Sequence, residues 1–172
     1  MADEIKYITM PASGLLSKEK KQKKSKPIPK KNRIVTDTKR WLNMKSCIEG
    51  SINDISFQLH CLDDPVYSTI IESQIYSKLR GYKSQDIEKN RFVESKFVTF
   101  TYVTDLIKTV EQRCYYCNEI VMILYESVRE PRQWTLERIN NNNGHNIDNV
   151  QIACLNCNLR RRTMFQERYV MT

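Results

Sequence analysis

The sequence has few glycines and no long apolar segment. Only four of its 172 residues are glycine, which argues against a sandwich or barrel built from many strands and tight turns. No stretch approaches the ~20 consecutive apolar residues that a membrane-spanning helix needs. The first residues, Met1 to Glu4, also lack the apolar run of a secretory signal. We therefore expect a protein of the reducing cell interior, not secreted and without a membrane partner, whose cysteines bind metal or stay free.

Positive charge is concentrated in one short segment. Residues 18–33 read KEKKQKKSKPIPKKNR and hold nine Lys or Arg and one Glu, whereas the rest of the chain has 19 basic and 19 acidic residues. This segment has no apolar periodicity, so we predict a disordered basic tail over residues 1–35. The tail can neutralise nucleic-acid phosphates or direct the protein to the nucleus, and the alternative is a tail that only improves solubility. Its candidate nucleic-acid-binding residues are Lys20, Lys21, Lys23, Lys24, Lys26, Lys30, Lys31 and Arg33.

A helical region is predicted over residues 36–112. Asp64 and Pro65 are typical of a helix start, and Gly81 offers a stop. The apolar residues between them recur at helical spacing: Tyr67, Ile70, Ile71, Ile75 and Leu79. A second helix is predicted to begin near Thr99 or Thr101 and to carry Val103, Leu106, Ile107 and Val110.

The connection between these two helices contains cations beside an aromatic residue, in segments 80–83 and 89–91. Contact with a phosphate backbone is one interpretation, and a solvated connector is the other. Cys47 and Cys61, the second beside His60, offer only three donors, so we interpret both cysteines as free and buried.

Two Cys-x-x-Cys pairs give the most specific signal. Cys114 and Cys117 form the first pair, and Cys154 and Cys157 form the second. Two such pairs complete a tetrahedral shell of four thiolates around Zn²⁺, which leaves no position for water and predicts a structural zinc. The alternatives are a redox Cys-x-x-Cys, which lacks a βαβ context here, and two unrelated cysteine pairs.

The segment between the pairs predicts two strands, and the segment after them predicts a helix. Residues 134–139 alternate as a strand, with Trp134, Leu136 and Arg138 on one face and Glu137 on the other. The run of asparagines that ends at Gly144 is typical of a turn. Residues 150–153 form a second short strand, and residues 158–169 contain no Gly or Pro and can form a helix.

Several motifs together resemble a known family. They are Cys-x-x-Cys, Leu-Glu-Arg-Ile-Asn at 136–140, Gly-His-x-x-Asp-Asn-Val at 144–150, and Cys-x-x-Cys-Asn at 154–158. This pattern resembles the zinc-containing HNH (ββα-metal) endonucleases, in the branch found in large DNA viruses and bacteriophages. The resemblance covers about residues 113–165.

The resemblance implies a role for several residues. Glu137 stands where the family has an acidic or histidine ligand of one catalytic divalent metal, and Asn158 stands where it has a second ligand. Oxygen ligands of this kind suit Mg²⁺ or Mn²⁺. Asn149 matches the asparagine that fastens the loop between the strands.

The sequence departs from the family pattern in two ways, since Glu137 and Asn140 stand where the family more often has a pair of Asp residues, which removes a carboxylate, and the position of the general base also differs. The family has a water-activating histidine directly after the metal-binding acid, and this chain has Arg138. A guanidinium cannot act as a general base at neutral pH, but it can clamp a phosphate. His145 is the candidate substitute base, and an exposed loop histidine without a catalytic role is the alternative. Arg160, Arg161 and Arg162 fan out over about 200° of the following helix, so one or two of them are expected to contact phosphate.

We expect an α+β protein with a disordered tail (1–35), a helical region (36–112) and a zinc-binding HNH-like domain (113–172). The first hypothesis is a metal-dependent endonuclease that hydrolyses DNA phosphodiester bonds. The second is a catalytically inactive nucleic-acid-binding or virion-associated protein on the same scaffold. A zinc module that binds only protein is a third. The expected partner is nucleic acid, most simply DNA, in the cytoplasm or nucleus of a host cell or in a virion.

Overall fold

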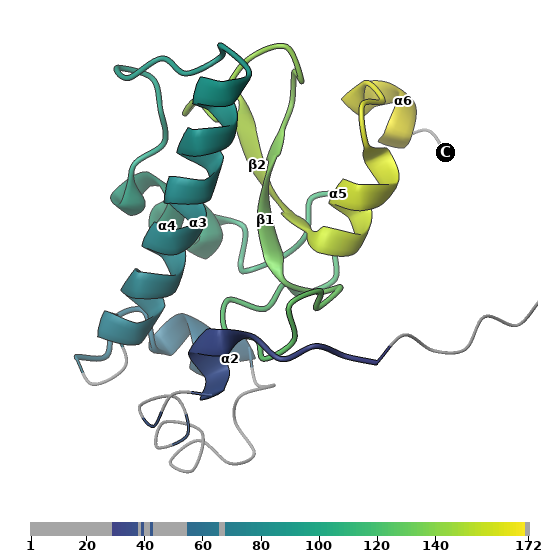
Figure 1. Cartoon of the computed structure of the whole chain (residues 1–172). Helices are drawn as coiled ribbons and strands as arrows, with labels where there is room; N and C mark the ends of the chain where they lie inside the picture. Colours follow the sequence, from purple (N-terminus) through teal and green to yellow (C-terminus); the bar gives the residue numbers. More distant parts are fainter. Residues whose placement is uncertain (1–28, 38, 40–41, 43–54, 66–67, 171–172) are drawn as a thin grey trace, which may run out of the picture.

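The computed structural model describes residues 29–37, 39, 42, 55–65 and 68–170. The predictions for Lys20 to Lys26, Cys47 and Tyr67 lie outside these residues. The structure is α+β, as predicted, and Figure 1 shows its elements. In chain order these are η1 (Ile34–Asp37), α2 (Ile55–His60), α3 (Ser68–Glu88), α4 (Phe100–Thr109), β1 (Trp134–Arg138), β2 (Val150–Cys154), α5 (Leu155–Arg161) and α6 (Gln166–Val170).

An antiparallel hairpin of β1 and β2 forms the centre of the molecule. Trp134 lies opposite Cys154 at one end, and Arg138 lies opposite Val150 at the other. Figure 1 shows the hairpin between α3 and α4 on one side and α5 and α6 on the other. Both strands are almost wholly buried, because helices cover both of their faces. The two strands confirm the predictions of a strand near 134–139 and a second short strand near 150–153.

The long helix α3 lies along the free edge of β1. The Lys78 ammonium donates to the carbonyl of Trp134, and the Tyr82 hydroxyl accepts a 3.0 Å hydrogen bond from the amide of Leu136. These side chains satisfy backbone groups that would otherwise be left unpaired at the strand edge.

The predicted bounds of this helix were wrong at both ends. The helix begins at Ser68, after Pro65, and continues through Gly81 to Glu88. Gly81 has only open space where a Cβ would stand, so nothing in its surroundings requires a stop. The turns beyond it are held by tertiary contacts of Tyr82 and Asp86. The predicted connector at 80–83 is therefore helix.

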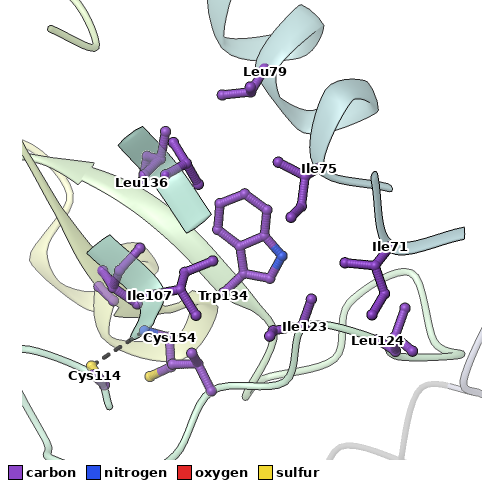
Figure 2. Close-up of a cluster of buried hydrophobic side chains, with 14 of the residues drawn as sticks. Ile71, Ile75, Leu79, Ile107, Cys114, Ile123, Leu124, Trp134, Leu136 and Cys154 are labelled. Carbon is purple, nitrogen blue, oxygen red and sulfur yellow. Dashed lines mark hydrogen bonds between the residues drawn. The ribbon is translucent and has the colours of Figure 1, made fainter. Parts of the chain in front are cut away.

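Trp134 lies at the centre of one hydrophobic core, as Figure 2 shows. Its indole is fully buried among side chains from α3, α4 and the segment before β1. These side chains are Ile71, Ile75, Leu79, Ile107, Ile123 and Leu124. Cys114 and Cys154 belong to the same core. The boundary predicted at residue 112 thus runs through a single packed core.

Two further features place the flanking segments. Arg33, assigned to the tail from sequence, stacks over the ring of Tyr125 at 4.2 Å and bonds to the Tyr125 carbonyl and to Gln74.

At the other end, the predicted helix 158–169 is two helices, because Arg162 has a positive φ of 53°. Among the described residues, no helix combines the length and apolar character needed to cross a membrane.

Candidate metal centre and nucleic-acid interface

The structure brings the four cysteines of the two Cys-x-x-Cys pairs together. The ligand atoms of Cys114, Cys117, Cys154 and Cys157 all lie within 4.8 Å of one another, and all four thiols are free. Four sulfurs bound tetrahedrally at about 2.3 Å from Zn²⁺ would lie about 3.8 Å apart. The Sγ atoms of Cys117 and Cys154 are 3.9 Å apart. The cluster therefore fits the size of a four-thiolate zinc site.

Backbone amides around the cluster favour thiolate ligands. The amide of Cys154 donates to Sγ of Cys114 at 3.2 Å, and the amide of Cys157 donates to Sγ of Cys154 at 3.4 Å. The second of these bonds also makes Cys154 the N-cap of α5. Amide donors stabilise sulfur in its charged form, which is the form that binds metal. A zinc ion here would tie the start of α5 to the segment after α4.

Glu137 faces α5 and is neutralised by an arginine. The Arg161 guanidinium donates to Oε1 of Glu137, and the two side chains are 0% and 4% exposed. The same guanidinium donates to the carbonyl oxygens of Arg138 at 2.7 Å and Ile139 at 2.9 Å. Burial raises the pKa of Glu137, and the charge of Arg161 acts in the opposite direction. Arg161 is one of the three arginines of which one or two were predicted to contact phosphate, and in the structure its buried guanidinium binds the end of β1.

Asn158 lies against the same face of β1 but has a different partner. Its amide donates to the hydroxyl of Thr135 at 3.1 Å. Two neighbouring contacts therefore join α5 to this face of β1: one from Asn158 to Thr135, and one from Arg161 to Glu137. The divalent metal predicted at Glu137 and Asn158 stays a prediction.

His145 is buried and bonded, which contradicts the alternative of an exposed loop histidine and leaves its role as a base a prediction. Its Nδ1 lies 2.9 Å from Oδ1 of Asp86, and its backbone amide donates to Oδ2 of the same carboxylate. The Tyr82 ring packs on the imidazole at 4.4 Å. Burial lowers the pKa of His145, opposed by the charge of Asp86. These contacts hold the loop against α3.

Asn149 and Gly144 shape the loop between the strands. The Asn149 side chain bonds to the amide and carbonyl of Asn140 and to the carbonyl of Gly144. These hydrogen bonds hold the loop between the strands in place, which is the role that the resemblance implies for Asn149. A Cβ at Gly144 would lie 2.5 Å from the carbonyl oxygen of Arg91 and 2.8 Å from Oδ2 of Asp86. Only glycine lets this loop approach the end of α3 so closely.

The close approach creates a pocket lined by cations, which we call the basic pocket. Its volume is about 580 Å³. It lies between the segment that follows α3, the run of asparagines at 140–143 and residues 162–165, which separate α5 from α6. Its lining residues are Lys89, Arg91, Arg138, Asn140, Asn141, Asn142, Arg161, Arg162, Thr163 and Phe165. Among the described residues that line it, none is acidic.

Sequence reasoning found some of these residues and missed others. Arg138 and Arg162 were predicted to contact phosphate, whereas Asp86 and the role of Arg161 were missed. One signal was available for Arg161: it lies four residues after Cys157, which the helical period places on the buried face of α5. No pattern of residues near Asp86 indicates that it pairs with a histidine 59 positions later. Arg160, the third predicted arginine, is exposed and lies outside the basic pocket.

No family model, curated protein or solved structure matches this chain.

Proposed function

We propose that this chain is a zinc-stabilised nucleic-acid-binding protein built on an HNH-like scaffold that does not cleave its ligand. The observation that carries the proposal is the buried bond between Arg161 and Glu137. In the family that the sequence resembles, the residue at the position of Glu137 binds a divalent cation. Here a side chain of the chain itself already supplies the positive charge at that carboxylate.

Replacing this guanidinium by a metal ion would be costly. Arg161 also satisfies the carbonyl groups of Arg138 and Ile139. Its departure would leave these two acceptors without their donor. A buried acceptor that loses its donor costs about 1–3 kcal/mol, which a metal ion would have to offset before it bound.

The other elements of a hydrolytic site also serve different roles. Arg138 replaces the expected histidine and holds its proton at neutral pH. His145 is kept by Asp86 and Tyr82 inside the loop that supports the pocket. These arrangements favour a site that holds phosphate over one that activates water.

The remaining features favour binding to nucleic acid. The zinc cluster and the single core would keep the hairpin and α5 rigid, and cations line the adjoining pocket. Segment 18–33 adds eight net positive charges. Proteins that neutralise phosphates with Lys and Arg bind nucleic acid with a strong dependence on salt.

The test compares binding and cleavage with one zinc-loaded preparation. Binding is measured by the fluorescence anisotropy of labelled DNA and RNA, and cleavage by the nicking of supercoiled plasmid with Mg²⁺ or Mn²⁺. We expect salt-dependent binding and no nicking above the level of a Glu137→Gln control. Metal-dependent nicking that the control lacks would contradict the proposal.

A second candidate, the metal-dependent endonuclease, is favoured by one observation. The Asp86 carboxylate orients the His145 imidazole at 2.9 Å, as acidic residues orient the general base in many hydrolases. If His145 were that base, His145→Gln would abolish nicking while DNA binding persisted. The plasmid assay therefore separates the two candidates.

A further inference from the structure

An exposed aromatic ring lies at the basic pocket. Phe165 stands in the break between α5 and α6, is 72% exposed and lines the pocket beside Arg162 and Thr163. A phenylalanine exposed to this degree forgoes the stabilisation that its burial would bring. Its position next to several cations points to a ligand with both an aromatic ring and a negative charge.

The cations around this ring come from three separate parts of the chain. Lys89 and Arg91 follow α3, Arg138 ends β1, and Arg162 follows α5. Arg138 is held in place by a 3.3 Å hydrogen bond from its guanidinium to the carbonyl of Asn143. Arg162 reaches the pocket because its positive φ ends α5.

Among the described residues, no carboxylate lines the pocket beside these cations. The two acidic groups beside Arg138 are Asp86 and Glu137. Asp86 is bonded to His145, and Glu137 is bonded to Arg161. A phosphate group would complete the charge balance of the pocket, since guanidinium groups bind phosphate with geometric specificity.

We propose that the basic pocket holds one nucleotide of a single-stranded nucleic acid, with its phosphate among the guanidinium groups and its base against Phe165. The inference rests on the proposed function and names the class of ligand. A base can stack on a protein ring only when it is free of its neighbours, which is the rule for single-stranded ligands. The pocket volume of about 580 Å³ lies within the ~300–1,000 Å³ range typical of small-molecule sites. The side-chain amides of Asn140, Asn141 and Asn142 supply donors and acceptors for the sugar or base.

The experiment measures the binding of a labelled oligonucleotide, single-stranded or in a duplex of the same sequence, over a range of salt concentrations. The charge variant is Arg91→Ala with Arg162→Ala, and its control removes two exposed arginines outside the pocket, Arg129→Ala with Arg132→Ala. We expect the charge variant to lower the slope of log affinity against log salt by about 0.7 for each phosphate that it no longer neutralises. The control should keep the wild-type slope.

The ring is tested by Phe165→Ala, with Leu159→Ala as the control for removal of an exposed apolar side chain on α5. We expect Phe165→Ala to weaken single-strand binding on the order of ten-fold, as the removal of one stacking ring does. Duplex binding and the Leu159→Ala control should stay within two-fold or so of wild type. Zinc content and circular dichroism of every variant establish that it is folded.

A further arm identifies the source of the phosphate. Oligonucleotides with and without a 5′-terminal phosphate are compared, and inorganic phosphate and pyrophosphate are used as competitors. A preference for the terminal phosphate that vanishes in the charge variant assigns the pocket to the 5′ end of the oligonucleotide. Equal binding of both oligonucleotides, with a reduced slope in the charge variant, assigns it to an internal phosphate.

The outcomes separate this inference from the proposed function. Wild-type protein that binds no nucleic acid would overturn both. Wild-type binding with charge and ring variants that match their controls would overturn the nucleotide pocket alone. The same holds if Phe165→Ala weakens duplex and single-strand binding equally.

Discussion

The bond between Arg161 and Glu137 allows a quantitative prediction. Arg161→Met keeps an unbranched side chain of comparable length but removes the guanidinium. The Glu137 carboxylate, 4% exposed, would then be buried without its counter-charge. The carbonyl groups of Arg138 and Ile139 would lose a donor.

We expect this change to lower the free energy of unfolding by about 3–5 kcal/mol, the cost of breaking a buried ion pair from one side. That is a large part of the ~5–15 kcal/mol total of an ordinary domain. Arg160→Met, at the exposed neighbouring position, should change stability by only about ±0.5 kcal/mol. Replacing both partners, Arg161→Met with Glu137→Leu, should recover much of the stability, because no charge is left buried.

The destabilisation should also depend on pH. Burial raises the pKa of Glu137, and Arg161 opposes this effect, so the variant has a folded-state pKa further above the unfolded value. Such a carboxyl contributes stability below its unfolded pKa and loses it as the pH rises through the folded pKa. The difference between wild type and variant should therefore be smaller at mildly acidic pH than at neutral pH.

Urea unfolding followed by tryptophan fluorescence, with zinc present, measures these differences. Zinc content is checked at each pH so that the comparison covers only metal-loaded protein. The reasoning would be refuted by a destabilisation below about 1 kcal/mol, or by one equal to that of Arg160→Met. A destabilisation independent of pH would refute the assignment to Glu137.

Three more predictions concern the zinc cluster, the loop and the strand edge. Cys114→Ser should lose one zinc per chain together with cooperative unfolding, because the metal's binding energy is folding energy; zinc release and calorimetry test this, and a stable zinc-free fold would contradict it. Gly144→Ala should destabilise the protein by about 1–3 kcal/mol, since its Cβ would lie 2.5 Å from a backbone oxygen of Arg91. Gly81→Ala, in open space on α3, should stabilise the protein by about 0.5–1 kcal/mol. Thermal unfolding measures both variants, and equal effects of Gly81→Ala and Gly144→Ala would contradict the close packing at Gly144. Burial lowers the pKa of Lys78 to about 7, so the unfolded chain binds more protons than the folded one between about pH 7 and 10. The stability of the wild type should therefore rise with pH over this range relative to that of Lys78→Met. Parallel pH profiles of the two proteins would show that the amine is not buried as described.

Local patterns were sufficient to predict several elements. The alternation at 134–139 predicted β1, which ends one residue earlier, and the helical spacing from Val103 to Val110 predicted α4, whose N-cap is Thr99. The spacing of the two Cys-x-x-Cys pairs predicted the cysteine cluster. In each case the residues that decide the structure are close together in the sequence, or their side-chain chemistry permits one arrangement.

Helix ends could not be predicted in this way. Gly81 is a good stop signal, yet α3 continues through it because Tyr82 bonds to the edge of β1 and Asp86 bonds to His145. The segment 158–169 has no helix breaker, yet the helix ends at Arg161. Interactions with residues distant in sequence outweigh the small differences in local propensity.

By itself the sequence determined the α+β class, the four-thiol cluster, the central strands and the excess of positive charge. Only the tertiary structure decided which charges stay available. Three adjacent arginines are equivalent in the sequence, but Arg161 is buried against Glu137 while Arg160 and Arg162 remain exposed. Likewise His145 lies in a polar loop yet is buried beside Asp86. The physical reason is that the environment of an ionisable group depends on its neighbours in space, and these are set only when the hairpin, α3 and α5 pack together.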